Sequence, residues 1–299
     1  MKKSFGKVVY LIGTILTFTL LLSACGSNNK ESSKSNKINV VTSVNFYSEA
    51  AKAVLGDKGN VTSIINSPSS DPHDFQPTPK DSKTVAKADF VIYNGAHYDS
   101  WMQSLLNNNS SAKVTNVSND LMGKDDHDNA HIWYDYRTMP KLVNSLAKQF
   151  SKKDAKNAKF YENNAKKYIE SLKPIEKTVK QIKQQHKHNN KVDVTEPVFN
   201  YMLNDMGYTI NDAGFSKAVE HEIDPTPQNI RDLQDDIKHK KISFLVVNSQ
   251  TSDTTVQNMI KLANENKLPI VKVSETMPKN TNYKDWIMSS LNQVKNLNK

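Results

Sequence analysis

The feature that most constrains the fold is a long apolar stripe at helical spacing in the middle of the chain. Its members alternate steps of three and four residues, which lines one face of a helix and leaves the lysines on the other faces: Ala158, Tyr161, Ala165, Tyr168, Leu172, Ile175, Val179 and Ile182. From Asp154 to His186 the helix would run about 50 Å. Pro174 should bend it. Because the stripe continues in phase, we expect one bent helix, with two helices separated at Lys173-Pro174 as the alternative.

Short apolar runs bounded by turn residues alternate with helical patterns on both sides of this helix, which is typical of an α/β fold. Strands are expected at Ile38–Ser43, Val61–Asn66, Asp89–Asn94, Lys113–Val117, Lys191–Thr195, Ile242–Asn248 and Pro269–Val273. Helices are expected at Tyr47–Val54, Ser100–Leu106, Val198–Met206, Thr254–Asn266 and Asn282–Leu297. The sequence therefore predicts an N-terminal lobe (38–150), a connecting helix (151–190) and a C-terminal lobe (191–299).

A short internal echo favours two similar lobes. Pro77-Thr78-Pro79 precedes one helical stretch and strand, and Pro225-Thr226-Pro227 precedes another. In both, threonine suits the N-cap and the second proline suits the first helical position. Since α/β folds bind ligands at the carboxyl ends of their strands, the cleft between the lobes is the expected site.

The N-terminal residues 1–24 are typical of a secretory signal segment. Three lysines precede the uncharged stretch Val8–Leu22, which is too short for a transmembrane helix of about 20 residues. No later stretch is long and apolar enough to span a membrane, so the remaining chain is expected to be soluble.

The single cysteine follows this segment directly, in Leu22-Ser23-Ala24-Cys25-Gly26. One cysteine excludes an internal disulfide scaffold. The surrounding residues resemble the lipobox at which bacterial lipoproteins are cleaved and acylated, which predicts lipidation of Cys25 and a membrane anchor. A stray cysteine beside an ordinary signal peptide is the alternative. Residues 25–37 are polar and lysine-rich, as expected of a flexible tether.

The positive charge is local. The chain carries a net charge of +9, but residues 141–191 alone hold 14 lysines against 4 acidic residues. A solvated lysine-rich helix face explains this concentration, with a weak attraction to anionic membrane as the lesser alternative. No nucleic-acid partner is therefore expected.

Compact metal and catalytic motifs are absent from the sequence, so any metal ligands must come from scattered loops. His73 follows the second expected strand and precedes the helix capped by Thr78, and His131 precedes another helix. Either histidine alone would more often be a surface or hydrogen-bonded residue than a ligand.

The surroundings of these histidines change that judgement. Pro72-His73-x-Phe75-x-Pro77-Thr78 and Ala130-His131-Ile132-Trp133-x-Asp135 resemble the two histidine motifs of the metal-binding proteins of zinc/manganese ABC transporters. In that family each motif supplies one histidine ligand, and two α/β lobes are bridged by a long helix. The resemblance extends from about Ile38 to the C-terminus.

The resemblance also implies two ligands from the second lobe. They match Glu196, after the strand Lys191–Thr195, and Glu275, after Pro269–Val273. Without the resemblance, Glu196 would be a helix-start acid and Glu275 a solvated loop acid. Two neutral imidazoles and two carboxylates suit Zn²⁺ or Mn²⁺ as bound cargo.

The sequence gives weaker evidence that other residues contribute to the metal site. We expect Trp133 and Asp135 to orient the loop around His131. His127 lies in a short acidic stretch that could feed metal to the cleft, although a solvated loop is the simpler interpretation. Four further histidines are expected at the surface: His97, His186, His188 and His221.

The implied protein is a lipoprotein on the extracellular face of a Gram-positive cell membrane. It would be a monomer that passes a divalent metal ion to the membrane permease of an ABC importer. An extracellular zinc enzyme is the alternative from another class, since two histidines and a carboxylate also hold catalytic zinc. A surface adhesin is a third alternative. The fourth ligand and the lack of a separate general base favour binding over catalysis.

Overall fold

The computed structural model describes residues 37–68, 70–109, 111–185 and 189–297. The expected signal segment, Cys25 and all of the expected tether except Lys37 lie outside the described residues, as do His186 and His188. Within the described ranges, no helix is both long enough and apolar enough to cross a membrane.

The N-terminal lobe is built on a parallel sheet with strand order β2-β1-β3-β4. The strands are β1 (Ile38–Val44), β2 (Gly59–Ile65), β3 (Phe90–Tyr93) and β4 (Lys113–Asn116). The helices are α2 (Asn45–Leu55), α3 (Pro79–Val85), α4 (Met102–Leu106) and α5 (Thr138–Lys153). Every residue of β3 is buried, as expected of a strand in a parallel sheet covered on both faces.

The C-terminal lobe repeats this arrangement, with strand order β6-β5-β7-β8. The strands are β5 (Lys191–Val194), β6 (Thr209–Ile210), β7 (Leu245–Asn248) and β8 (Ile270–Val273). The helices are α7 (Asn200–Asp205), α8 (Ala213–Glu220), α9 (Pro227–Lys238), α10 (Thr254–Glu265) and α11 (Tyr283–Leu297). The predicted α/β class with two similar lobes is confirmed, although β6 and α8 were not predicted.

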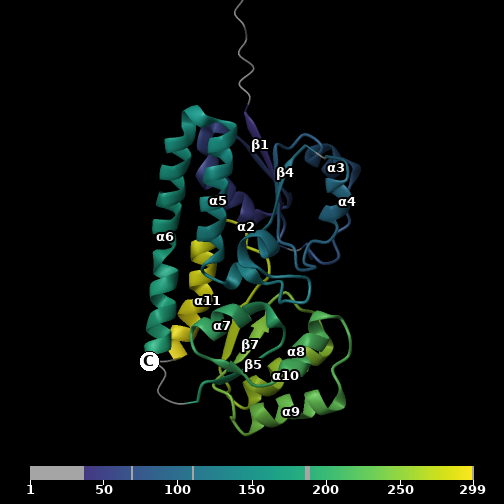
Figure 1. Cartoon of the computed structure of the whole chain (residues 1–299). Coiled ribbons are helices and arrows are strands. Elements are labelled where there is room, and N and C mark those ends of the chain that lie inside the picture. Colours follow the sequence, from purple (N-terminus) through teal and green to yellow (C-terminus); the bar gives the residue numbers. More distant parts are fainter. Residues whose placement is uncertain (1–36, 69, 110, 186–188, 298–299) are drawn as a thin grey trace, which may run out of the picture. The chain divides into compact units, whose positions relative to one another are not determined.

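The connecting helix is α6 (Ala158–Gln185), which contains Pro174 without interruption. It starts later than the predicted Asp154 because α5 continues to Lys153 and Asp154 turns the chain, accepting a hydrogen bond from Tyr161 Oη at 2.8 Å. Helix α6 packs against α2, α5, α7 and α11, and Figure 1 shows it running past elements of both lobes. One continuous helix, rather than two separated at Lys173-Pro174, is therefore the correct interpretation of the stripe.

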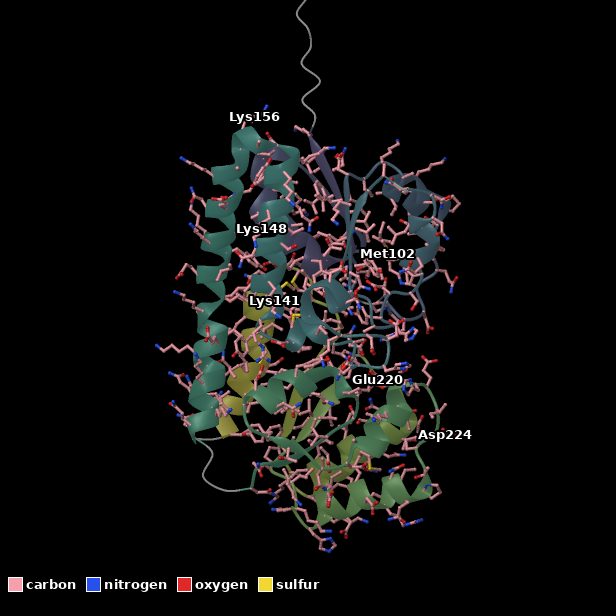
Figure 2. All side chains as sticks on the ribbon, viewed as in Figure 1. Met102, Lys141, Lys148, Lys156, Glu220 and Asp224 are labelled. Atoms are coloured by element: carbon pink, nitrogen blue, oxygen red, sulfur yellow. The ribbon has the colours of Figure 1, made fainter. Side chains whose placement is uncertain are left out.

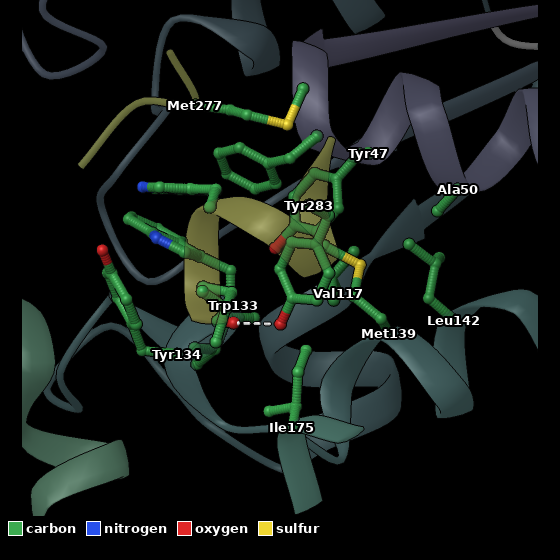
Figure 3. Close-up of a cluster of buried hydrophobic side chains, with 14 of the residues drawn as sticks. Tyr47, Ala50, Val117, Trp133, Tyr134, Met139, Leu142, Ile175, Met277 and Tyr283 are labelled. Carbon is green, nitrogen blue, oxygen red and sulfur yellow. Dashed lines mark hydrogen bonds between the residues drawn. The ribbon is translucent and has the colours of Figure 1, made fainter. Parts of the chain in front are cut away.

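One of the hydrophobic clusters contains residues of both lobes. Trp133 and Tyr134, from the turn before α5, are fully buried beside Tyr283 of α11. Tyr283 Oη donates to the Trp133 carbonyl at 2.6 Å, the dashed line in Figure 3. Tyr134 stacks edge-on against Phe199, which follows β5. This aromatic packing fixes the loop between β4 and α5 against the C-terminal lobe.

Both expected helix starts are present. Thr78 forms a capping box with Asp81 and precedes Pro79 at the start of α3. Thr226 accepts from the Asn229 backbone N–H and precedes Pro227 at the start of α9. The two Thr-Pro pairs therefore begin helices for the same physical reason in each lobe.

Candidate metal centre

His73 lies in the loop between β2 and α3. Its backbone N–H donates to Asp71 Oδ1 at 2.8 Å, and the indole N–H of Trp101 donates to the neighbouring Pro72 carbonyl at 2.9 Å. The imidazole ring packs edge-on against Tyr98, with 5.0 Å between the ring centroids. These contacts hold a partly exposed histidine in place beside the C-terminal lobe.

His131 precedes the short 3-10 turn Ile132–Tyr134 and is 1% exposed. Burial lowers the pKa of its imidazole to about 4, so the ring is neutral at neutral pH. Its Nε2 is buried and has no hydrogen-bond partner. A buried ring nitrogen with a free lone pair is expensive to leave unpaired, and a metal ion would satisfy it.

Glu275 brings these two histidines together from the C-terminal lobe. It follows β8, and its backbone N–H donates to Gln250 Oε1 at 2.7 Å. Its Oε2 lies 3.8 Å from His73 Nε2, and its Oε1 lies 3.8 Å from His131 Nε2. One donor atom from each of the three residues lies within 4.8 Å of the others. An ion about 2.0–2.2 Å from two donors can bridge a 3.8 Å separation.

Glu196 lies beside this group, but it is not among the residues whose donor atoms lie within 4.8 Å of one another. It follows β5, and its Oε2 accepts from Asn248 Nδ2 at 2.7 Å; the same nitrogen donates to Glu275 Oε1 at 3.0 Å. Burial raises the pKa of Glu196 to about 7, with a further contribution from Glu275. Burial likewise raises the pKa of Glu275. Two carboxylates this close in a buried site favour a cation between them.

Glu220, the last residue of α8, was not predicted as a site residue. Its Oε1 lies 3.7 Å from His131 Nδ1, and burial raises the pKa of its carboxyl group. The sequence analysis did not single it out, since helix α8 itself was not predicted. Figure 2 shows Glu220 between the lobes and Asp224 further out on the following loop.

Of the two residues expected to orient the loop around His131, Trp133 lies beside the imidazole ring, whereas Asp135 hydrogen-bonds another residue. The Trp133 ring lies 5.1 Å from the imidazole, between centroids. Asp135 instead accepts from Arg137, whose backbone N–H and Nε donate to the same Oδ1. The side chain that hydrogen-bonds His131 is Asn129, which the sequence did not single out.

A cavity of about 910 Å³ opens beside these residues. No lysine or arginine is among its lining residues in the described chain, and none of these residues comes from the lysine-rich segment 141–191. Eight acids line it: Asp71, Asp74, Glu196, Glu220, Glu222, Asp224, Asp253 and Glu275. Carboxylates concentrated in a concave site attract cations and repel anions.

The other histidines of the described ranges lie outside the His73–His131–Glu275 group. His127 is exposed, and exposed His97 lies 3.9 Å from Asp126. His221 is exposed as predicted, yet it also lines the cavity, next to Glu220.

Comparison with known proteins assigns the chain to a family. Residues 40–297 match the profile of the family described as zinc-uptake complex component A, periplasmic. The manganese ABC transporter substrate-binding lipoprotein PsaA of Streptococcus pneumoniae is 26% identical over 278 residues, covering 86% of this chain and 87% of that protein. The iron ABC transporter substrate-binding lipoprotein MtsA of Streptococcus pyogenes is 28% identical over 273 residues, covering 85% and 86%.

Solved structures share the fold. The periplasmic zinc-binding protein TroA of Treponema pallidum superposes with a TM-score of 0.73 at 17% identity, covering 88% of this chain and 99% of that one. A manganese-bound periplasmic metal-binding protein of Candidatus Liberibacter asiaticus gives 0.68 at 21% identity, covering 87% and 100%. With the family profile spanning nearly all of both lobes, the chain belongs to the zinc-uptake complex component A family of metal-binding transport proteins.

Proposed function

We propose that this protein captures a divalent transition metal ion, zinc or manganese, in the cavity between its lobes and delivers it to the membrane permease of an ABC importer. The observation that carries the proposal is the buried, unpartnered Nε2 of His131, which lies 3.8 Å from Glu275 Oε1. Glu275 itself lines a cavity rich in acids, with no lysine or arginine among the described lining residues. Such a site attracts a dication and offers it a nitrogen donor.

The proposed ligands are His73, His131, Glu196 and Glu275, two from each lobe. The two carboxylates would neutralise the charge of a dication, and the two imidazoles would add neutral donors. In the described structure Glu196 is outside the group formed by the other three and would have to move to join them, although its carboxylate and that of Glu275 accept hydrogen bonds from the same Asn248 nitrogen. Because one chain supplies all four residues, we propose that the protein acts as a monomer.

Elemental analysis and competition binding on metal-stripped protein test this function. We expect about one zinc or manganese ion per chain and no hydrolysis in a general hydrolase screen. Hydrolysis that depends on bound zinc would instead support the zinc-enzyme alternative. Failure of both ions to bind would contradict metal capture.

Replacing Glu196 by histidine should widen the preference for zinc. Zinc is expected to bind tighter than manganese in vitro, because the affinity order places it well above manganese at nearly any nitrogen and oxygen site. Exchanging a hard carboxylate for an imidazole in Glu196→His should increase the zinc-to-manganese affinity ratio about tenfold or more. Competition between the two ions in wild type and variant measures this, with Glu222→His as the control at the cavity wall. An unchanged ratio would mean that Glu196 is not a ligand.

Membrane attachment is proposed to depend on Cys25. The lipobox-like residues before it support acylation, and the polar residues after it would separate the anchor from the lobes. Cys25→Ala should move the protein from the membrane fraction to the medium while leaving its metal affinity unchanged. Cell fractionation followed by immunoblotting measures the first effect, and titration of the released protein measures the second. A variant that stays in the membrane fraction would require another anchor.

A further inference from the structure

The side chain of Asn129 makes three contacts that its position in the sequence does not predict. Its Oδ1 accepts from the His131 backbone N–H at 2.8 Å and also lies 2.8 Å from the ring nitrogen Nδ1 of His131. Its Nδ2 donates to the Pro197 carbonyl at 2.7 Å. Since a carbonyl can only accept, this last bond fixes the orientation of the amide and turns Oδ1 toward the histidine.

This orientation decides which ring nitrogen of His131 carries the proton. An amide oxygen can only accept, so Nδ1 must be protonated to donate to it, and a neutral imidazole then has its lone pair on Nε2. The negative charge of Glu220, 3.7 Å from Nδ1, favours a proton at the same nitrogen. Nε2 is the buried, unpartnered atom that lies 3.8 Å from Glu275 Oε1.

Asn129 is also tied to the opposite lobe at two points. Pro197 directly follows Glu196, and Tyr201 Oη, from α7, donates to the Asn129 carbonyl at 2.7 Å. Two other residues also accept from the backbone N–H of a histidine two positions later, as Asn129 does from His131. They are Asp71, which accepts from His73, and Asp125, which accepts from His127. At these two histidines no ring contact with the turn residue is described, so a backbone turn alone does not explain the position of Asn129.

We propose that Asn129 is a positioning residue of the metal site: it holds His131 in the Nδ1–H tautomer and couples that ring to the segment that carries Glu196. This inference rests on His131 being a metal ligand. A hydrogen-bond acceptor behind a ligating histidine fixes its tautomer and orientation, and losing such a partner typically lowers metal affinity about 10–100-fold.

Three variants separate the effect of the hydrogen-bond acceptor at His131 Nδ1 from the effect of the contacts with the C-terminal lobe. Asn129→Ala removes both the acceptor for Nδ1 and the bond to Pro197. Asn129→Asp keeps an acceptor for Nδ1 but cannot donate to the Pro197 carbonyl. Tyr201→Phe removes one contact between the lobes and leaves the acceptor in place. Asn107→Ala, at an exposed asparagine, is the matched control.

The readout is the ¹⁵N NMR signature of the His131 ring in metal-free protein, together with the Kd for zinc. We expect wild type, Asn129→Asp, Tyr201→Phe and Asn107→Ala to show the Nδ1–H tautomer, and Asn129→Ala to show a mixture. Zinc affinity should fall about 10–100-fold in Asn129→Ala and recover in large part in Asn129→Asp.

A pure Nδ1–H signature in Asn129→Ala would overturn the proposal, and so would an unchanged zinc affinity in that variant. Equal losses in Asn129→Ala and Asn129→Asp would overturn the tautomer role. The NMR measurement needs no metal. It is therefore independent of the proposed function, which is tested separately by metal binding and the hydrolase screen on wild type.

Discussion

His131→Ala is expected to abolish tight binding of both zinc and manganese. The variant loses one of the two neutral nitrogen donors of the group at a position that is 1% exposed, and leaves His73 as the one histidine in that group among the described residues. The loss should exceed the roughly 100-fold upper end for removal of a partner behind a ligand. Calorimetric titration of each ion into metal-stripped protein measures it. His73→Ala should behave in the same way.

His127→Ala is the matched control for this experiment. His127 is an exposed histidine in the same loop, and its backbone N–H donates to Asp125 as that of His73 does to Asp71. Its replacement should leave both affinities unchanged. If His131→Ala and His73→Ala both bind metal as tightly as wild type while remaining folded, the assignment of these histidines is wrong.

Asp193→Asn is expected to stabilise the protein above neutral pH. Asp193 is fully buried in β5, and burial raises the pKa of its carboxyl group from 3.8 to about 7, with Asp236 and Asp212 contributing. A raised pKa means that the folded state holds the proton more tightly. The resulting stability is fully present below pH 3.8 and is lost as the pH rises through about 7.

Asparagine fits this position without a charge. Its oxygen can accept from the Asp212 backbone N–H, as Asp193 Oδ1 does at 2.8 Å, and its amide nitrogen would replace Oδ2, which has no hydrogen-bond partner. The pKa change corresponds to at most roughly 4 kcal/mol, and 1 kcal/mol to about 2–4 °C in Tm for a chain of this size.

Thermal unfolding at pH 5 and pH 8.5 tests the prediction. Asp193→Asn should melt several degrees above wild type at pH 8.5, and the difference should shrink at pH 5. Asp232→Asn, on the exposed side of α9, is the control and should show no such dependence. A difference that is the same at both pH values would contradict proton-linked stability at Asp193.

The periodic and capped elements could be predicted because their signals are local. The stripe from Ala158 to Ile182 specifies a helix by itself, and Thr78 and Thr226 mark helix starts through contacts within four residues. The two-residue strand β6 carries no periodicity to detect. The predicted start of α6 at Asp154 was wrong. Asp154 is both the C-cap of α5 and the N-cap of the short 3-10 turn that precedes α6.

The site was less accessible to sequence reasoning. The positions of His73, His131, Glu196 and Glu275 came from motifs and from their places after strands. Nothing local distinguishes Glu220 from a surface acid, because its approach to His131 depends on how α8 packs across the cleft. The role of Asn129 could not be predicted for the same reason, because its partners Pro197 and Tyr201 are about 70 residues away in the sequence.

The three tryptophans of the chain all lie beside the site. Trp101 donates to the carbonyl preceding His73, the Trp133 ring faces His131, and Trp286 Nε1 donates to Ser274 Oγ, next to Glu275. The tryptophan fluorescence of this protein therefore originates beside the site. Paramagnetic Mn²⁺ should quench this emission, whereas closed-shell Zn²⁺ should only shift it. The two ions could thus be told apart in unlabelled protein by their optical signals.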